Sequence, residues 1–208
     1  MLLLAAEYLG IAAFAVSGFT LGVRAKLDLL GIYLSAFFTA LGGGILRDLM
    51  ANRLPDSLTH SAPSLTVLAV TTLLLWGRMH RREPLLSRKL FVFVDALGMV
   101  SFAISGAVTG LEAGFNAAGV TLLAFTTAVG GGILRDILIN EVPYVLRGGF
   151  YGIIALGIGL SIYLLNLAEC DTPLALIPLF VGGVFLRMLA WSRGWSLPRP
   201  GEEHDATP

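Results

Sequence analysis

Long apolar runs make up most of the chain, and short clusters of charged residues separate them. Seven windows contain no Lys, Arg, Asp or Glu, and they cover residues 8–23, 29–46, 57–77, 96–111, 113–134, 148–168 and 172–186. A helix needs about 20 apolar residues to cross a bilayer, and about 17 to 25 are tolerated. The pattern therefore predicts seven transmembrane helices, and the shorter windows must extend past a flanking charge.

The composition also indicates a membrane protein. Hydrophobic residues occupy 56% of the 208 positions, 25 further positions are glycine, and only 13% are charged. Soluble domains carry about 45–50% apolar residues, glycine included, and about 25% charged residues. The 14 basic and 14 acidic residues balance, which argues against the basic surface of a nucleic-acid-binding protein. We therefore expect the lipid bilayer as the surroundings and no nucleic acid as a partner.

Basic residues are distributed unevenly between the two ends of the predicted helices. Only Arg53 falls on the side of the amino terminus. Ten fall on the other side, namely Arg24, Lys26, Arg78, Arg81, Arg82, Arg88, Lys89, Arg147, Arg193 and Arg199. Cytoplasmic loops are enriched in Lys and Arg. We therefore predict a multi-pass protein of the plasma (inner) membrane, with the amino terminus outside, an uncleaved first helix and a cytoplasmic carboxyl terminus.

The chain contains an internal duplication with an offset of 88 residues. GGGILRDLMANRLP from Gly42 recurs as GGGILRDILINEVP from Gly130, and FAVSG from Phe14 recurs as FAISG from Phe102. Residues 7–55 and 95–143 share 23 identities in 49 ungapped positions. Such self-similarity indicates a duplicated structural unit. We expect three-helix units at 1–89 and 90–171, a seventh helix at 172–192 and a disordered cytoplasmic tail at 193–208.

Each unit contains three predicted helices. Because three crossings leave the chain on the opposite side, the second unit must enter the membrane in the inverted orientation. Inverted repeats are typical of transport proteins, whose binding or permeation site lies near the midplane between the repeats. The predicted fold is therefore an all-α membrane protein with seven transmembrane helices, an inverted 3+3 helix repeat and an added seventh helix, which packs either against the six-helix core or between subunits.

Two glycine triplets lie in the middle of the second and fifth predicted helices: Gly42, Gly43, Gly44 and Gly130, Gly131, Gly132. A glycine within a helix costs about 1 kcal/mol relative to alanine. We expect the triplets to break both helices and to expose carbonyl oxygens to a water-filled ion path. The alternative is close packing of two helices. Thr39 and Thr127, one turn earlier, either line the path or hydrogen-bond to the broken backbone.

Charged residues lie at or near membrane depth around this motif. They are Glu7, Arg47 and Asp48 in the first unit and Asp95, Arg135 and Asp136 in the second. Adjacent helical positions lie about 100° apart, so we expect neither arginine to pair with the aspartate that follows it. We expect the pairs Glu7–Arg47 and Asp95–Arg135, one at each end of the path. The alternative is that each charge extends to its nearest interface.

The doubled GGGILRD, followed each time by Asn and Pro, resembles the prokaryotic family of trimeric intracellular cation (TRIC) channels, which is also catalogued as glycine transporter-like. The resemblance implies a homotrimer with a pore in each protomer. It implies pores lined by helices two and five, bent at their glycines, that conduct potassium ions and, less selectively, sodium ions.

The residues themselves leave two functions open, a channel and a secondary carrier for glycine or another small zwitterion. A membrane scaffold without transport activity would give no reason for charges at this depth. No metal-site spacing or catalytic triad is present, so we expect no enzymatic activity, metal or cofactor.

Overall fold

The computed structural model describes residues 2–79, 87–147, 150–170 and 172–197. Within these residues all regular structure is helical, which confirms the predicted all-α class. The helices are α1 (Leu2–Arg24), α2 (Leu29–Met50), α3 (Asp56–Thr59), α4 (Ser61–Trp76), α5 (Arg88–Glu112), α6 (Ala117–Leu138), α7 (Tyr144–Arg147), α8 (Tyr151–Leu167) and α9 (Leu176–Ser192), with a 3-10 turn η2 (Pro173–Ala175). The predicted loop residues Arg81 and Arg82 and the tail from residue 198 lie outside the described residues.

Four helices of the described chain, α1, α2, α5 and α6, are long and apolar enough to cross a membrane. Helices α4, α8 and α9 are also apolar but have only 16, 17 and 17 residues. At 1.5 Å per residue they extend about 24 to 26 Å, less than a hydrocarbon core of about 30 Å. The chain is a multi-pass membrane protein, and the count of seven crossings stays a prediction.

The third predicted helix is divided in two. The sequence predicts one helix over 57–77, but the chain turns at His60, which has extended backbone angles (φ −117°, ψ 141°) between α3 and α4. Pro63 follows in the first turn of α4. Proline is tolerated there because the N–H groups of the first turn have no acceptor within the helix. The second unit has the same arrangement, with the short helix α7 ahead of α8.

Equivalent residues begin and end α2 and α6. The side chains of Asp28 and Asn116 precede these helices, and each accepts a hydrogen bond from the backbone N–H three residues later, at 2.8 and 2.9 Å. Such caps satisfy one of the free N–H groups at a helix start. Asn52 and Asn140 follow the two helices with φ angles of 55° and 58°. This left-handed conformation is one that asparagine adopts more readily than most residues, so the Asn of the repeated motif ends each helix.

The two units make reciprocal contacts. Phe14 and Phe102, which are equivalent positions, stack on each other with ring centroids 5.2 Å apart. Gly10 lies against the ring of Phe102, and its equivalent Gly98 lies against the ring of Phe14. A contact that recurs with the partners exchanged is the signature of a two-fold axis. The two units are therefore related by an approximate two-fold axis that passes between the two phenylalanines.

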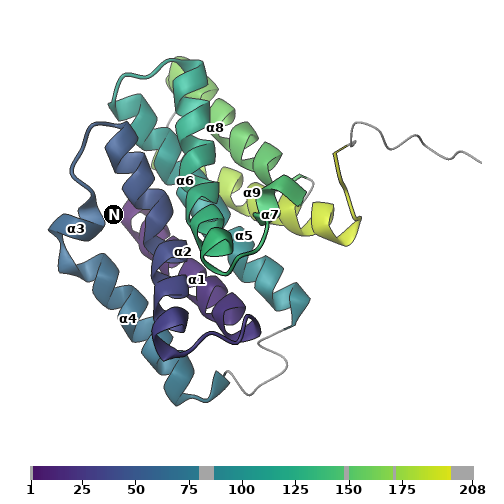
Figure 1. Ribbon diagram of the computed structural model, residues 1–208. Coiled ribbons are helices and arrows are strands. Elements are labelled where there is room, and N and C mark those ends of the chain that lie inside the picture. Colours follow the sequence, from purple (N-terminus) through teal and green to yellow (C-terminus); the bar gives the residue numbers. More distant parts are fainter. Residues whose placement is uncertain (1, 80–86, 148–149, 171, 198–208) are drawn as a thin grey trace, which may run out of the picture.

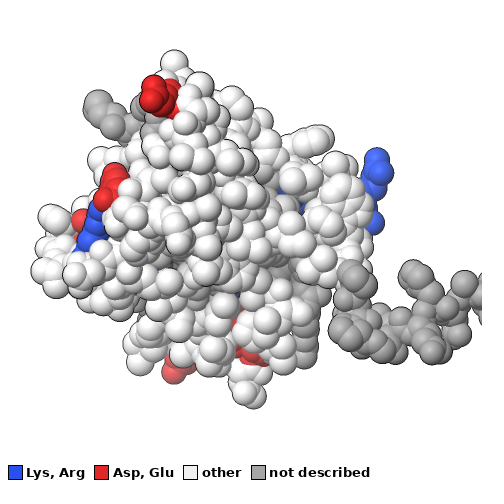
Figure 2. Space-filling view, turned by 90° about the horizontal axis from the view of Figure 1, so that it is seen from above, with Lys and Arg blue, Asp and Glu red and all other residues white. Residues whose placement is uncertain are grey.

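Helices α1, α2, α5 and α6 form the centre of the molecule, with α4 against α1 and α2 and α8 against α5 and α6 (Figure 1). Helix α9 packs on α5 and α8 and stands outside the repeat. Figure 2 shows a face on which charged side chains are sparse and lie mostly in small groups near the rim. An outer surface with so few charges suits contact with lipid.

Candidate ion path and its charged ends

The glycine triplets form the crossing between α2 and α6. Both helices are continuous through their glycines, so the predicted break is wrong. A methyl group at Gly43 would overlap the carbonyl oxygen of Thr127, and one at Gly131 would overlap that of Thr39. The absent side chains let the two backbones touch, as small residues do between membrane helices. This contact offsets the low helix propensity of glycine, which is why no break occurs.

Thr39 and Thr127 belong to the crossing. Both are fully buried, and each hydroxyl donates a hydrogen bond to the carbonyl four residues earlier in its own helix, at 2.5 and 2.6 Å. Neither residue lines the two cavities described below. Both hydroxyls therefore hydrogen-bond within their own helices and do not line the cavities.

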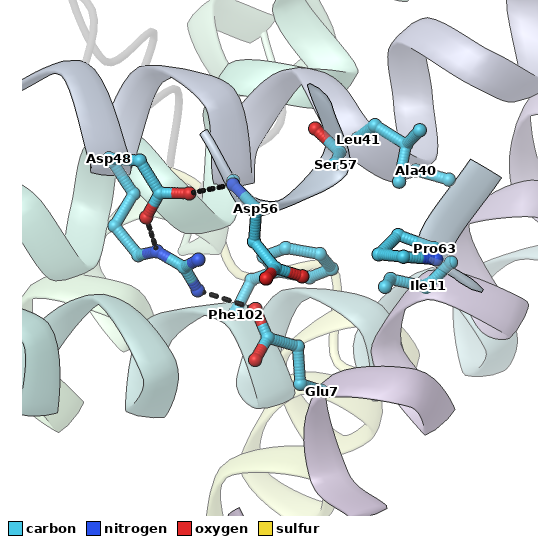
Figure 3. A pocket seen from close by; sticks show the side chains of 11 residues that line it. Glu7, Ile11, Ala40, Leu41, Asp48, Asp56, Ser57, Pro63 and Phe102 are labelled. Carbon is cyan, nitrogen blue, oxygen red and sulfur yellow. Dashed lines mark hydrogen bonds and ion pairs between the residues drawn. The ribbon is translucent and has the colours of Figure 1, made fainter. Parts of the chain in front are cut away.

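A small cavity lies beyond the crossing on the carboxyl-terminal side of α2 (Figure 3). Its lining includes Gly44, Phe102 and the charged residues Glu7, Arg47 and Asp48, which we call the first charged end. Nη1 of Arg47 lies 2.6 Å from Oε1 of Glu7, and Nε lies 2.7 Å from Oδ1 of Asp48. The cavity measures about 20 Å³, which is room for about one water molecule.

An equivalent cavity lies on the carboxyl-terminal side of α6. Its lining includes Gly132 and the charged residues Asp95, Arg135 and Asp136, which we call the second charged end. Nη1 of Arg135 lies 3.6 Å from Oδ1 of Asp95, and Nε lies 2.9 Å from Oδ1 of Asp136. This cavity measures about 10 Å³, at the lower limit for a single water molecule. The two charged ends thus repeat one arrangement of an arginine between two carboxylates.

The contacts of both arginines differ from the sequence expectation in one respect. Glu7 and Asp95 contact Arg47 and Arg135 as expected, but each arginine also binds the aspartate next to it. The arginine side chain is long enough to fold back, so that its Nε reaches a neighbour whose Cβ points about 100° away. Arg47 and Arg135 are 6% and 3% exposed, so they do not extend outward from the protein.

Two serines complete the charged ends. Ser17 donates a hydrogen bond to Oδ1 of Asp95 at 2.9 Å and accepts one from Nη1 of Arg135 at 3.0 Å. Ser105, its equivalent, accepts a hydrogen bond from Nη1 of Arg47. The repeat contains both serines, but its pattern predicted no polar role for them. The missed signal is a polar residue that recurs in FAVSG and FAISG among apolar neighbours.

The second carboxylate oxygen of each aspartate fixes the short helix that follows. Oδ2 of Asp48 accepts a hydrogen bond from the backbone N–H of Asp56 at 3.0 Å, and Oδ2 of Asp136 accepts one from Tyr144 at 2.7 Å. Both N–H groups belong to the first turn of α3 or α7, where the helix itself supplies no acceptor. Each charged end is therefore joined to the entrance of the next long helix, as the dashed lines in Figure 3 show for the first.

Comparisons with known sequences agree with this architecture. A family model described as "Glycine transporter" matches residues 4–79 and 92–166. The UPF0126 membrane protein YvgT of Bacillus subtilis is 31% identical over 192 residues, which cover 91% of this chain and 92% of that protein. The UPF0126 inner membrane protein YadS of Escherichia coli (strain K12) is 33% identical over 151 residues, 70% of each chain. A UPF0126 membrane protein of Deinococcus radiodurans is 36% identical over 143 residues, 67% of this chain and 64% of that protein.

Solved structures share the whole fold. A prokaryotic TRIC channel in 0.5 M KCl superposes with a TM-score of 0.84 and 28% identity, and the match covers 95% of this chain and 99% of that one. The TRIC trimeric intracellular cation channel orthologue from Rhodobacter sphaeroides superposes with a TM-score of 0.84 and 29% identity. This match covers 92% of this chain and 98% of that one. A third structure, from work on conductance through TRIC cation channels, superposes with a TM-score of 0.83 and 34% identity. This match covers 96% of this chain and 97% of that one.

Fold, charged ends and sequence matches together define a multi-pass membrane protein built from two repeated helical units. The chain belongs to the TRIC family, whose sequence model is described as "Glycine transporter".

Proposed function

We propose that this chain is a monovalent cation channel that conducts potassium ions and, less selectively, sodium ions. The observation that supports this most strongly is the pair of equivalent charged cavities, one beyond each side of the α2–α6 crossing. The likeness to solved TRIC cation channels over more than nine tenths of both chains supports the same function. In this proposal an ion enters at one charged end and leaves at the other.

The proposed path runs beside the glycine crossing and not through broken helices. Gly44 and Gly132, the last glycines of the triplets, line the two cavities, whereas Gly43 and Gly131 pack against the backbone of the facing helix. Phe14 and Phe102 stack across the two-fold axis, so their contact is equidistant from the two equivalent cavities, and in this proposal it forms the constriction between them. Apolar constrictions close channels by excluding water. The cavities hold about one water each, so the path is closed in this conformation.

The charged ends supply both closure and attraction for cations. An arginine bound to two carboxylates joins α2 or α6 to the neighbouring helices, and this holds the end shut. When the arginine moves aside, the same carboxylates face the path and raise the local concentration of cations. With the amino terminus outside and the units inverted, the first charged end faces outward and the second faces the cytoplasm.

We propose a homotrimer with one path in each protomer. The Rhodobacter sphaeroides orthologue is named as trimeric, and this chain matches it over almost its whole length. Both charged pairs form within one chain, which is consistent with one path in each protomer. The mass of the purified protein, measured by light scattering with the detergent contribution subtracted, should equal three chains.

Planar bilayers containing the purified protein test the function. Under a KCl gradient, the current should reverse close to the potassium equilibrium potential, and replacement of potassium by sodium should shift the reversal potential only slightly. A reversal potential near that of chloride would contradict a cation path. Saturable glycine uptake into vesicles without any ionic current would instead favour the carrier.

A further inference from the structure

Arg187 of α9 is a buried arginine outside both charged ends. Its side chain is 3% exposed, and Nη2 donates a hydrogen bond to the hydroxyl of Tyr144 at 3.1 Å. Its guanidinium carbon lies 4.9 Å from the ring centre of Tyr151 and 5.5 Å from that of Tyr144, distances typical of cation–π contacts. Its Nε makes no hydrogen bond to any described residue. An unsatisfied buried donor is costly, so packing of α9 alone does not explain an arginine here.

The two tyrosines connect Arg187 to the second charged end. Both line its cavity, and their rings meet edge to face with centroids 5.8 Å apart. Tyr151 shares the lining of this cavity with Asp95, while the backbone N–H of Tyr144 donates a hydrogen bond to Asp136. Arg187 therefore contacts two residues of this cavity, one of which binds a carboxylate there.

The first charged end has no such arrangement. The positions equivalent to Tyr144 and Tyr151 are Asp56 and Pro63, and both line the first cavity. Three carboxylates and one guanidinium surround that cavity, so its net charge is −2. At the second end, Asp95, Asp136 and Arg135 line the cavity and give a net charge of −1, which the nearby Arg187 offsets. Helix α9 thus removes the symmetry of the repeat, both in charge and in the packing around the arginine.

We propose that Arg187 is a positioning residue that keeps the second charged end closed, so that α9 controls this end of the path and not the other. The proposal rests on the proposed channel function. The guanidinium holds both tyrosine rings in place, and the tyrosines in turn support the closed end, since both line its cavity and Tyr144 binds Asp136. Without the guanidinium the rings are free to turn, and the closed arrangement loses its support.

Two double-mutant cycles in planar bilayers test this. Arg187→Met keeps much of the length and apolar bulk of the side chain, and it should raise the open probability about fivefold. In combination with Asp95→Asn, Arg187→Met should raise the open probability little further, because both changes loosen the same charged end. Combined with Glu7→Gln, the matched change at the first charged end, the two effects should multiply.

Two further variants separate position from charge. Arg187→Lys keeps the charge but loses the planar group that stacks on the rings, so it should also raise the open probability and leave the unitary conductance unchanged. Tyr151→Leu removes the ring that lies against Arg187, and it should act in the same direction. These two variants decide the matter if Arg187→Met does not assemble.

The proposal is overturned if the effect of Arg187→Met on the open probability multiplies equally with those of Asp95→Asn and Glu7→Gln. Arg187 would then act on neither charged end in particular. The proposal is also overturned if Arg187→Lys behaves as wild type while Arg187→Met changes only the unitary conductance, which is an effect of charge alone. A wild-type protein that passes no cation current would instead reject the proposed function itself.

Discussion

Phe14 stacks on Phe102, its own equivalent 88 residues later, with 5.2 Å between the ring centroids. Two residues related by the internal two-fold axis can meet only on that axis, so this contact marks where the axis passes between α1 and α5. Phe102 also lines the first charged cavity, which links the apolar centre to a charged end. In the proposed channel this stack is the apolar barrier between the two cavities.

Loss of either aromatic ring should therefore weaken the barrier. Phe14→Leu and Phe102→Leu should raise the open probability by similar factors, because the two positions are equivalent. Phe19→Leu is the matched control, since Phe19 is also fully buried but is outside the stack. Single-channel recordings measure the effect, and an equal response in the control would assign it to general loss of packing.

The glycine crossing leads to a prediction about stability. Gly43→Ala and Gly131→Ala place a methyl group on a backbone carbonyl, and such overpacking costs about 1–3 kcal/mol. Gly44→Ala is the matched control, because the nearest atom to its new methyl group is Cε1 of Phe102 at 3.6 Å. This change should be neutral or stabilising, since alanine favours helix. Thermal unfolding in detergent, followed by circular dichroism, measures the difference. Equal melting temperatures for Gly43→Ala and Gly44→Ala would contradict the close crossing.

Ser17 bridges Asp95 and Arg135, whose direct separation of 3.6 Å is long. Ser17→Ala should therefore destabilise the protein by about 1–3 kcal/mol, because two buried charged groups each lose a hydrogen bond. Ser161→Ala, which removes only an exposed hydroxyl bonded within its own helix, should have little effect. Unfolding in detergent compares the two variants, and equal stability would mean that the bridge contributes nothing.

The proposed orientation can be tested with the exposed native Cys170, which lies between α8 and α9. An impermeant thiol reagent should label it in intact cells, because this loop is assigned to the outside. Lys26→Cys in a Cys170→Ser background should be protected until the cells are opened. The reverse labelling pattern would invert the topology and exchange the faces of the two charged ends.

Hydrophobic windows and the 88-residue offset were sufficient to predict the helical class and the equivalence of the two units. The helical class and the equivalence of the units could be predicted because both follow from repeated patterns that the sequence shows directly. The common membrane side of Glu7 and Arg47 suggested that they pair, and the offset extended this expectation to Asp95 and Arg135. Pattern alone could not show that α2 and α6 stay continuous at Gly43 and its equivalent, because that depends on the atoms of the facing helix.

Side-chain reach explains the other differences. Helical angles describe where a Cβ points, but the Nε of Arg47 lies several bonds further and returns to Asp48. Ser17 is small and occurs in a motif that equally favours packing, so its hydrogen bonds became visible only with its neighbours in place. Arg187 lies outside the repeat, and no equivalent position indicated its tyrosine partners.

The most direct test of the account is the unitary current of the purified wild-type protein in a planar bilayer, recorded beside the double variant Glu7→Gln with Asp95→Asn. We expect discrete potassium current steps in both proteins and a higher open probability in the double variant, because each change weakens one closure of the same path. Absence of steps in both proteins, together with saturable glycine uptake by the wild type, would contradict it.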